Sequence, residues 1–84
     1  MLAESTVLRR RVLAGRRRLL GETHWHTLEC EALLAMELAE QDQIAEAREI
    51  RDRLLPIVRR ILGPAHRITG WLNDPDFLDP SRFE

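Results

Sequence analysis

An internal repeat limits what this chain of 84 residues can fold into more than any other feature of its sequence. Residues 17–27 read Arg-Arg-Leu-Leu-Gly-x-x-His-x-x-Thr, and residues 59–69, 42 positions later, read Arg-Arg-Ile-Leu-Gly-x-x-His-x-x-Thr. The match continues upstream in six further pairs: Glu4 and Glu46, Leu8 and Ile50, Arg9 and Arg51, Arg11 and Arg53, Val12 and Leu54, Leu13 and Leu55. Self-similarity at a fixed period predicts stacked structural units that bury their apolar faces against neighbouring units. Proteins built this way usually present a surface to other proteins.

The composition predicts that these units are helical. Leu, Ala, Glu and Arg dominate the sequence, and all four residue types favour helices. Tyr is absent and β-branched residues are few, which argues against a sheet. We therefore expect an all-α fold in a single domain whose core is small, so that the chain is only marginally stable alone.

Three long helices follow from the spacing of the apolar residues. Residues 6–20, 27–41 and 44–62 carry apolar side chains three and four positions apart. In the first segment these are Leu8, Val12, Leu13, Leu19 and Leu20. We expect Gly21 to end the first helix and Thr27 to begin the second, because glycine accepts a left-handed backbone and threonine caps helices. Pro56 is expected to kink the third helix.

The second copy of the repeat is incomplete. Where another long helix is expected, residues 70–75 read Gly-Trp-Leu-Asn-Asp-Pro, which supports at most a turn or two of helix. We therefore expect a helical domain over residues 1–72 and an acidic tail with prolines over residues 73–84. The tail carries Phe77 and Phe83, and we expect it to dock on this chain or on a second copy, because solvation would leave both aromatic rings exposed.

Charges are distributed unevenly along the chain, although the net charge is only −1. Residues 1–20 carry six Arg and one Glu, whereas residues 28–52 carry eight acidic residues and two Arg. One interpretation is that a basic helix lies beside an acidic helix in the same chain. The other is head-to-tail self-association through opposite charges.

Residues 24–69 resemble the 42-residue tetratricopeptide repeat of the kind found in kinesin light chains. That family opens each unit with Leu-Gly-x-x-His-Pro-x-Thr-Leu, and this chain has a Trp in place of the proline: Leu20, Gly21, His24, Trp25, Thr27 and Leu28. Small and apolar residues follow at the family's helix A positions: Leu34, Ala35 and Leu38. The resemblance implies antiparallel helical hairpins and non-catalytic binding of other proteins.

The resemblance covers one full repeat flanked by half units, so apolar faces are expected to stay exposed at the ends of the stack. A homodimer, a larger assembly or a cap made by the tail would each cover them. We favour the homodimer, because two-fold dimers are the commonest oligomers. Family members that bind extended peptides often carry asparagines in the middle of helix A, where this chain has Ala32 and Leu33. An apolar contact surface is therefore expected instead.

A partner protein is expected to contact large apolar residues on the helices and the tail. Trp25, at the position of the family's proline, is the first candidate anchor, because exposed tryptophans often dominate binding energy. The full set of predicted interaction residues is Trp25, Leu33, Leu34, Ile57, Trp71 and Phe77.

The alternative is a regulator linked to a metal or to nucleic acid. A thiolate with imidazoles suits zinc, and the candidate ligands are His24, His26, Cys30 and His66. Their spacing matches no standard zinc pattern, and the equivalence of His24 and His66 in the repeat favours a role at the turns. The arginines at residues 9–11 and 16–18 could bind phosphate, but the acidic remainder of the chain would repel it. We therefore expect no metal, no cofactor and no nucleic-acid partner.

No pattern typical of an enzyme is present, whether a Ser/His/Asp arrangement, a glycine-rich phosphate loop or paired carboxylates. Cys30 is the single cysteine, so no internal disulfide can form, and a reducing cytoplasm is expected. No apolar run approaches the ~20 residues of a membrane span, and we expect no signal peptide.

Overall fold

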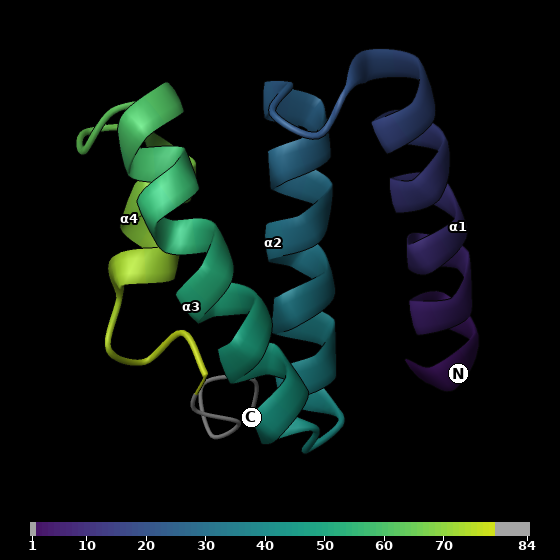
Figure 1. The fold of residues 1–84 in the computed structure, drawn as a ribbon. Coiled ribbons are helices and arrows are strands. Elements are labelled where there is room, and N and C mark those ends of the chain that lie inside the picture. The colour runs from purple at the N-terminus through teal and green to yellow at the C-terminus, as the bar shows by residue number, and fades with distance from the viewer. Residues whose placement is uncertain (1, 79–84) are drawn as a thin grey trace.

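The computed structural model describes residues 2–78, and their side chains from Thr6 onward. This part of the chain is all-helical, contains no strand and has four helices: α1 (Leu2–Leu20), α2 (Trp25–Glu40), α3 (Ile44–Ile61) and α4 (Arg67–Asn73) (Figure 1). The expected all-α fold is therefore confirmed. Within residues 2–78, no helix is both long enough and apolar enough to cross a membrane.

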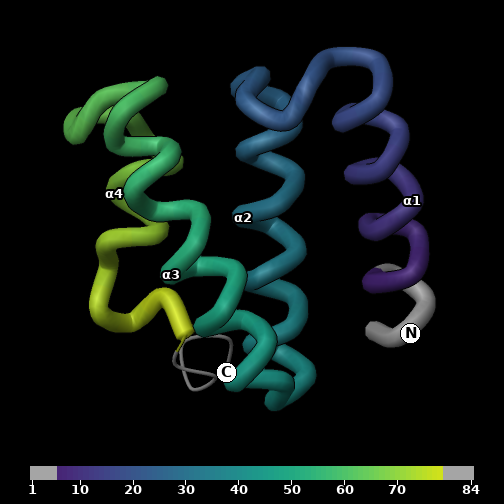
Figure 2. Tube along the Cα trace, viewed as in Figure 1, coloured from purple at the N-terminus to yellow at the C-terminus, as the bar shows by residue number. Residues whose placement is uncertain are grey.

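The helices follow one another as antiparallel neighbours. α2 packs against α1 on one side and α3 on the other, and α4 packs on α3 and touches α2 (Figures 1 and 2). Among the described helices, α1 therefore packs against α2 alone.

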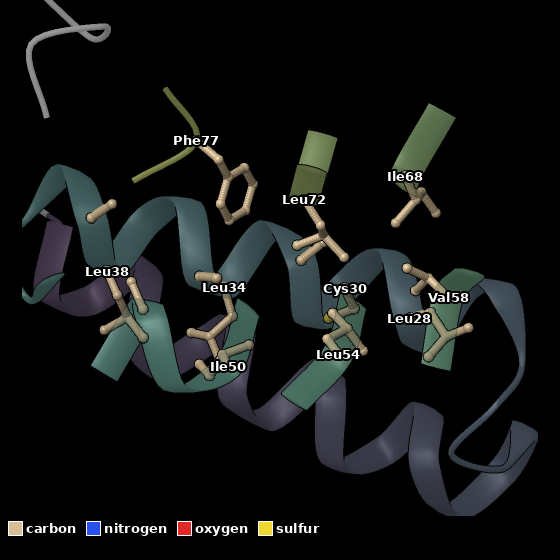
Figure 3. Close-up of a cluster of buried hydrophobic side chains, with 14 of the residues drawn as sticks. Leu28, Cys30, Leu34, Leu38, Ile50, Leu54, Val58, Ile68, Leu72 and Phe77 are labelled. Carbon is tan, nitrogen blue, oxygen red and sulfur yellow. The ribbon is translucent and has the colours of Figure 1, made fainter. Parts of the chain in front are cut away.

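The core lies between α2, α3 and α4. In Figure 3, Ile68, Leu72 and Phe77 form one row of side chains beside α2, and Ile50, Leu54 and Val58 form another. From α1, only Leu13 is a buried apolar side chain in the described part of the chain. Of the five apolar residues that the sequence places on one stripe of the first helix, four are exposed, because α1 packs against α2 alone: Leu8, Val12, Leu19 and Leu20.

The repeated motif builds the same turn twice. Gly21 and Gly63 adopt φ values of 89° and 92°, which glycine reaches without steric cost. His24 and His66 then cap α2 and α4: the Nδ1 atom of His24 accepts a hydrogen bond from the backbone N–H of His26 at 3.2 Å, and that of His66 from Ile68 at 3.1 Å. The equivalence of the two histidines therefore reflects a structural role at the turns.

The helix boundaries differ from the expected ones by a few residues. α1 begins before residue 6, and α2 begins at Trp25, because His24 rather than Thr27 is the cap. Thr27 is instead fully buried inside the first turn of α2. α3 runs without interruption past Pro56, which lies on the exposed side of the helix. The expected turn or two of helix near the C-terminus is present as α4.

The start of the tail folds back onto the helices. After α4, the carboxylate of Asp74 accepts a hydrogen bond from the backbone N–H of Asp76 at 2.9 Å. The backbone carbonyl of Asp74 accepts a second hydrogen bond, from the N–H of Phe77, at 3.0 Å. Pro75 fits the second position of this turn because its φ is already fixed near the required value. The turn brings Phe77 into the core, as Figure 3 shows. Docking of the tail on its own chain is confirmed for Phe77, whereas Phe83 lies outside the described residues.

Two glycines should respond to alanine with opposite signs. A methyl group at Gly15, inside α1, would meet no heavy atom within 4 Å. Gly15→Ala should therefore raise the free energy of unfolding by about 0.5–1 kcal/mol. Gly63 has the same open space but a φ of 92°, so Gly63→Ala should lower it by about 1 kcal/mol. Chemical denaturation followed by circular dichroism measures both changes, and equal signs would contradict these backbone conformations.

Candidate protein-interaction surface

Ion pairs between the basic and acidic helices hold α1 in place. Arg9 donates two hydrogen bonds to Oε1 of Glu37 on α2, at 3.0 and 2.6 Å, and these bonds raise the pKa of Arg9. Arg10 pairs with Glu46 on α3 at 2.8 Å. The interpretation that a basic helix lies beside an acidic one is confirmed.

Glu31 joins three helices. Its carboxylate is almost fully buried and accepts a hydrogen bond from Arg53 on α3, while a guanidinium nitrogen of Arg17 on α1 lies 3.3 Å from the same carboxylate oxygen. These groups line a cleft of about 320 Å³ between α1 and α3. The arginines and carboxylates that line this cleft pair with one another. The cleft therefore connects the three helices and is a poor binding site for another molecule.

Cys30 is an inert thiol in this arrangement. It is buried between α2 and α1, with its Sγ atom 3.9 Å from the carbonyl oxygen of Arg9. Burial raises the pKa of this thiol, so it stays protonated near neutral pH. Cys30 is therefore a small residue of the core.

Three apolar side chains are exposed along one side of α1. Leu8, Val12 and Leu19 recur every four and seven positions, so they share one side of the helix. Their exposed fractions are 59%, 45% and 83%. We call these three residues the open face of α1. Contiguous exposed apolar surface of this kind often marks a binding site.

The internal repeat shows what the open face of α1 lacks. The repeat equivalents of Leu8, Val12 and Leu19 lie on α3, where their exposed fractions are 9% for Ile50, 0% for Leu54 and 41% for Ile61. Ile50 and Leu54 belong to the core cluster that α2 completes (Figure 3). α1 has no such helix in the described part of the chain, so its equivalent side chains remain exposed.

A hollow adjoins the open face. It has a volume of about 280 Å³ and is lined by Leu8, Arg9 and Val12 of α1 and by Glu37 of α2. Oε1 of Glu37 accepts both hydrogen bonds from Arg9, whereas Oε2 is buried without a hydrogen-bond partner among the described residues. The hollow therefore joins two apolar side chains of the open face to the Arg9–Glu37 ion pair.

Two of the predicted interaction residues are buried. Leu34 is 3% exposed because α1 and α3 cover it on both sides, and Phe77 is 1% exposed because the tail turn places it in the core. A contact residue must reach the surface, so both are removed from the candidate interaction surface.

The other four predicted residues stay at the surface but are not gathered into one patch. Trp25 is 43% exposed, beside the ring of His26. Leu33 is half-buried on α2. Ile57 and Trp71 are half-buried and pack against the core, and the guanidinium of Arg67 lies 5.1 Å from the centre of the Trp71 ring. Of these four, Trp25 offers the most accessible large side chain.

Sequence reasoning missed the open face of α1 as an interaction surface. The incomplete repeat predicts an exposed apolar face at an end of the stack, but helical spacing alone does not say which side of the first helix a neighbouring helix covers. Leu8, Val12 and Leu19 are therefore absent from the predicted interaction residues.

The described residues give little support to the metal and nucleic-acid alternatives. Across residues 2–78, no group of three or more His, Cys, Asp or Glu side chains is placed to hold a metal ion. His24 and His66 are engaged as caps. Among the α1 arginines, Arg9, Arg10 and Arg17 pair with carboxylates of this chain, which reduces the positive charge available to phosphate.

Comparison of the chain with protein-family models, curated proteins and solved structures found no match.

Proposed function

We propose that this chain is a non-catalytic protein–protein interaction module, a small adaptor or regulatory subunit of tetratricopeptide type. The observation that carries the proposal is the open face of α1: Leu8 and Val12 are exposed there, whereas their repeat equivalents on α3, Ile50 and Leu54, are buried in the core. An apolar helix face that lacks its neighbour is stabilised when another protein supplies one.

The tetratricopeptide assignment is supported by the local geometry of the repeated motif. Both copies place glycine in the left-handed conformation, histidine at the helix cap and threonine in the buried first turn. α2 and α3 form one helical hairpin, with α1 before it and α4 after it as the half units. This order also agrees with the resemblance. The cytoplasm, as a reducing compartment, suits the single buried thiol of Cys30.

Self-association is the second part of the proposal, with Trp25 as its anchor. Tryptophan is enriched among residues that dominate interface energies, and this side chain is large and accessible.

Light scattering coupled to size exclusion tests self-association. Over a dilution series, the weight-average mass should rise with concentration from the chain mass of 9.8 kDa toward twice that value. Trp25→Ser should weaken dimerisation at least tenfold, since truncating a tryptophan anchor costs about 2 kcal/mol or more. The matched control is Val7→Ser, at an exposed apolar residue on α1. A mass fixed at 9.8 kDa up to millimolar concentration contradicts the homodimer.

A further inference from the structure

We propose that the open face of α1 binds a single amphipathic helix with an acidic edge, antiparallel to α1, as α2 binds α3. This inference rests on the proposed function and specifies the chemistry of the partner. The facing side of that helix carries apolar residues against Leu8 and Val12, and a carboxylate opposite Arg11.

The internal repeat supplies the shape of the partner. α3 and α1 share their sequence pattern, and the side of α3 that corresponds to the open face is covered by one antiparallel helix, α2. α2 brings branched and small residues to its buried sides, among them Leu34, Ala35 and Leu38. A helix of the same kind fits the open face, because Leu8 and Val12 occupy the positions of Ile50 and Leu54.

The repeat also supplies the charge of the partner. Arg53 on α3 pairs with Glu31 on α2, and the repeat equivalent of Arg53 is Arg11. Arg11 is exposed and forms no ion pair with the residues that the structure describes. A carboxylate at the position of Glu31 on the incoming helix would complete the same pair.

A second copy of α1 is a poorer occupant than an acidic helix. Arg11 and Arg16 lie on either side of the open face by helical position. Two such faces brought together would place arginines opposite arginines, which is unfavourable at an interface.

A peptide with the sequence of residues 22–41 is the first probe, because it is a helix of the α2 type from this same chain. It carries an N-terminal fluorescein and Cys30→Ser, and its binding to the full chain is followed by fluorescence anisotropy. Saturable binding is expected. Val12→Gln in the chain should weaken it about tenfold, since a buried valine contributes of the order of one decade of affinity. Val7→Gln, the matched change at an exposed valine off the open face, should alter it less than twofold.

Charge exchange tests the predicted ion pair. Arg11→Glu in the chain should weaken binding of the peptide at least fivefold. Glu31→Arg in the peptide should restore part of this lost affinity for the Arg11→Glu chain and for no other variant. Arg60→Glu makes the same charge change on α3 and serves as the control. Restoration by the exchanged pair supports antiparallel docking in the register of α2 on α3.

The outcomes separate this inference from the proposed function. If the peptide binds equally to the Val12→Gln and Val7→Gln variants, it binds elsewhere, and the inference is wrong although the module still binds protein. If light scattering shows a dimer that Val12→Gln dissociates and Trp25→Ser does not, a second copy occupies the open face, which also overturns it. If the chain neither self-associates nor binds the peptide, both proposals fail.

Discussion

Replacing Phe77 with alanine is expected to lower the free energy of unfolding by about 3–4 kcal/mol, the usual cost of removing a buried phenylalanine ring. The ring is 1% exposed and continues the row of Ile68 and Leu72 beside α2 (Figure 3). A small domain is stabilised by only about 5–15 kcal/mol in total. The variant should therefore be visibly destabilised in guanidinium denaturation followed by circular dichroism.

Leu19→Ala is the control for the Phe77 prediction. It also removes a large apolar side chain, but one that is 83% exposed, so it should change the free energy of unfolding by no more than about 0.5 kcal/mol. If Phe77→Ala costs less than about 1 kcal/mol, the ring does not hold the core in solution and the tail is only loosely attached.

The burial of Phe77 in the core of its own chain could be predicted from the sequence only in part. The aromatic residue was correctly expected to dock, yet it was also assigned to an external interface. Its burial depends on α4 ending at Asn73 and on the Asp74 turn that follows. Asp-Pro indicates a turn, but the direction in which the chain leaves that turn is set by the packing of α4 on α3, which periodicity does not encode.

The fold could be predicted in outline because its signals are local. Helical spacing gave the helices, and Gly21 and Gly63 gave their ends. Thr27 was a wrong choice of cap, because threonine is a preferred N-cap residue and histidine is not. In the structure, the His24 ring accepts the capping hydrogen bond and Thr27 is buried.

The pairing of a basic with an acidic helix was likewise predictable from charge blocks. The burial of Glu31 was not predictable, because a glutamate in a helix is ordinarily exposed to solvent. It is buried because Arg17 and Arg53 reach it from two neighbouring helices. Which carboxylate is buried depends on how both helices are placed, and a single-helix pattern does not contain that information.

Leu54→Ala is expected to lower the free energy of unfolding by about 3 kcal/mol, whereas Val12→Ala, at the equivalent repeat position, should change it by about 0.5 kcal/mol or less. Leu54 is fully buried beneath α2, and Val12 is 45% exposed on the open face of α1. Leucine has one methylene more than valine, worth roughly 0.8 kcal/mol when buried. The remaining difference therefore measures what a covering helix adds at this position.

Leu54→Met is the control that tests whether the loss of side-chain volume, and not any substitution at this position, destabilises the fold. It nearly conserves the side-chain volume and should cost less than about 1.5 kcal/mol. If Leu54→Ala and Val12→Ala destabilise the chain equally, the open face is covered in solution, and self-association at the concentration used must be the cause. If they differ as expected, both variants should be measured again with the chain saturated by the helical peptide. Val12→Ala should then lower the free energy of unfolding by more than it does in the free chain. The effect of Leu54→Ala should stay near its value in the free chain. Only Val12 gains a neighbour in the bound state, so the peptide would supply to α1 the cover that α2 already supplies to α3.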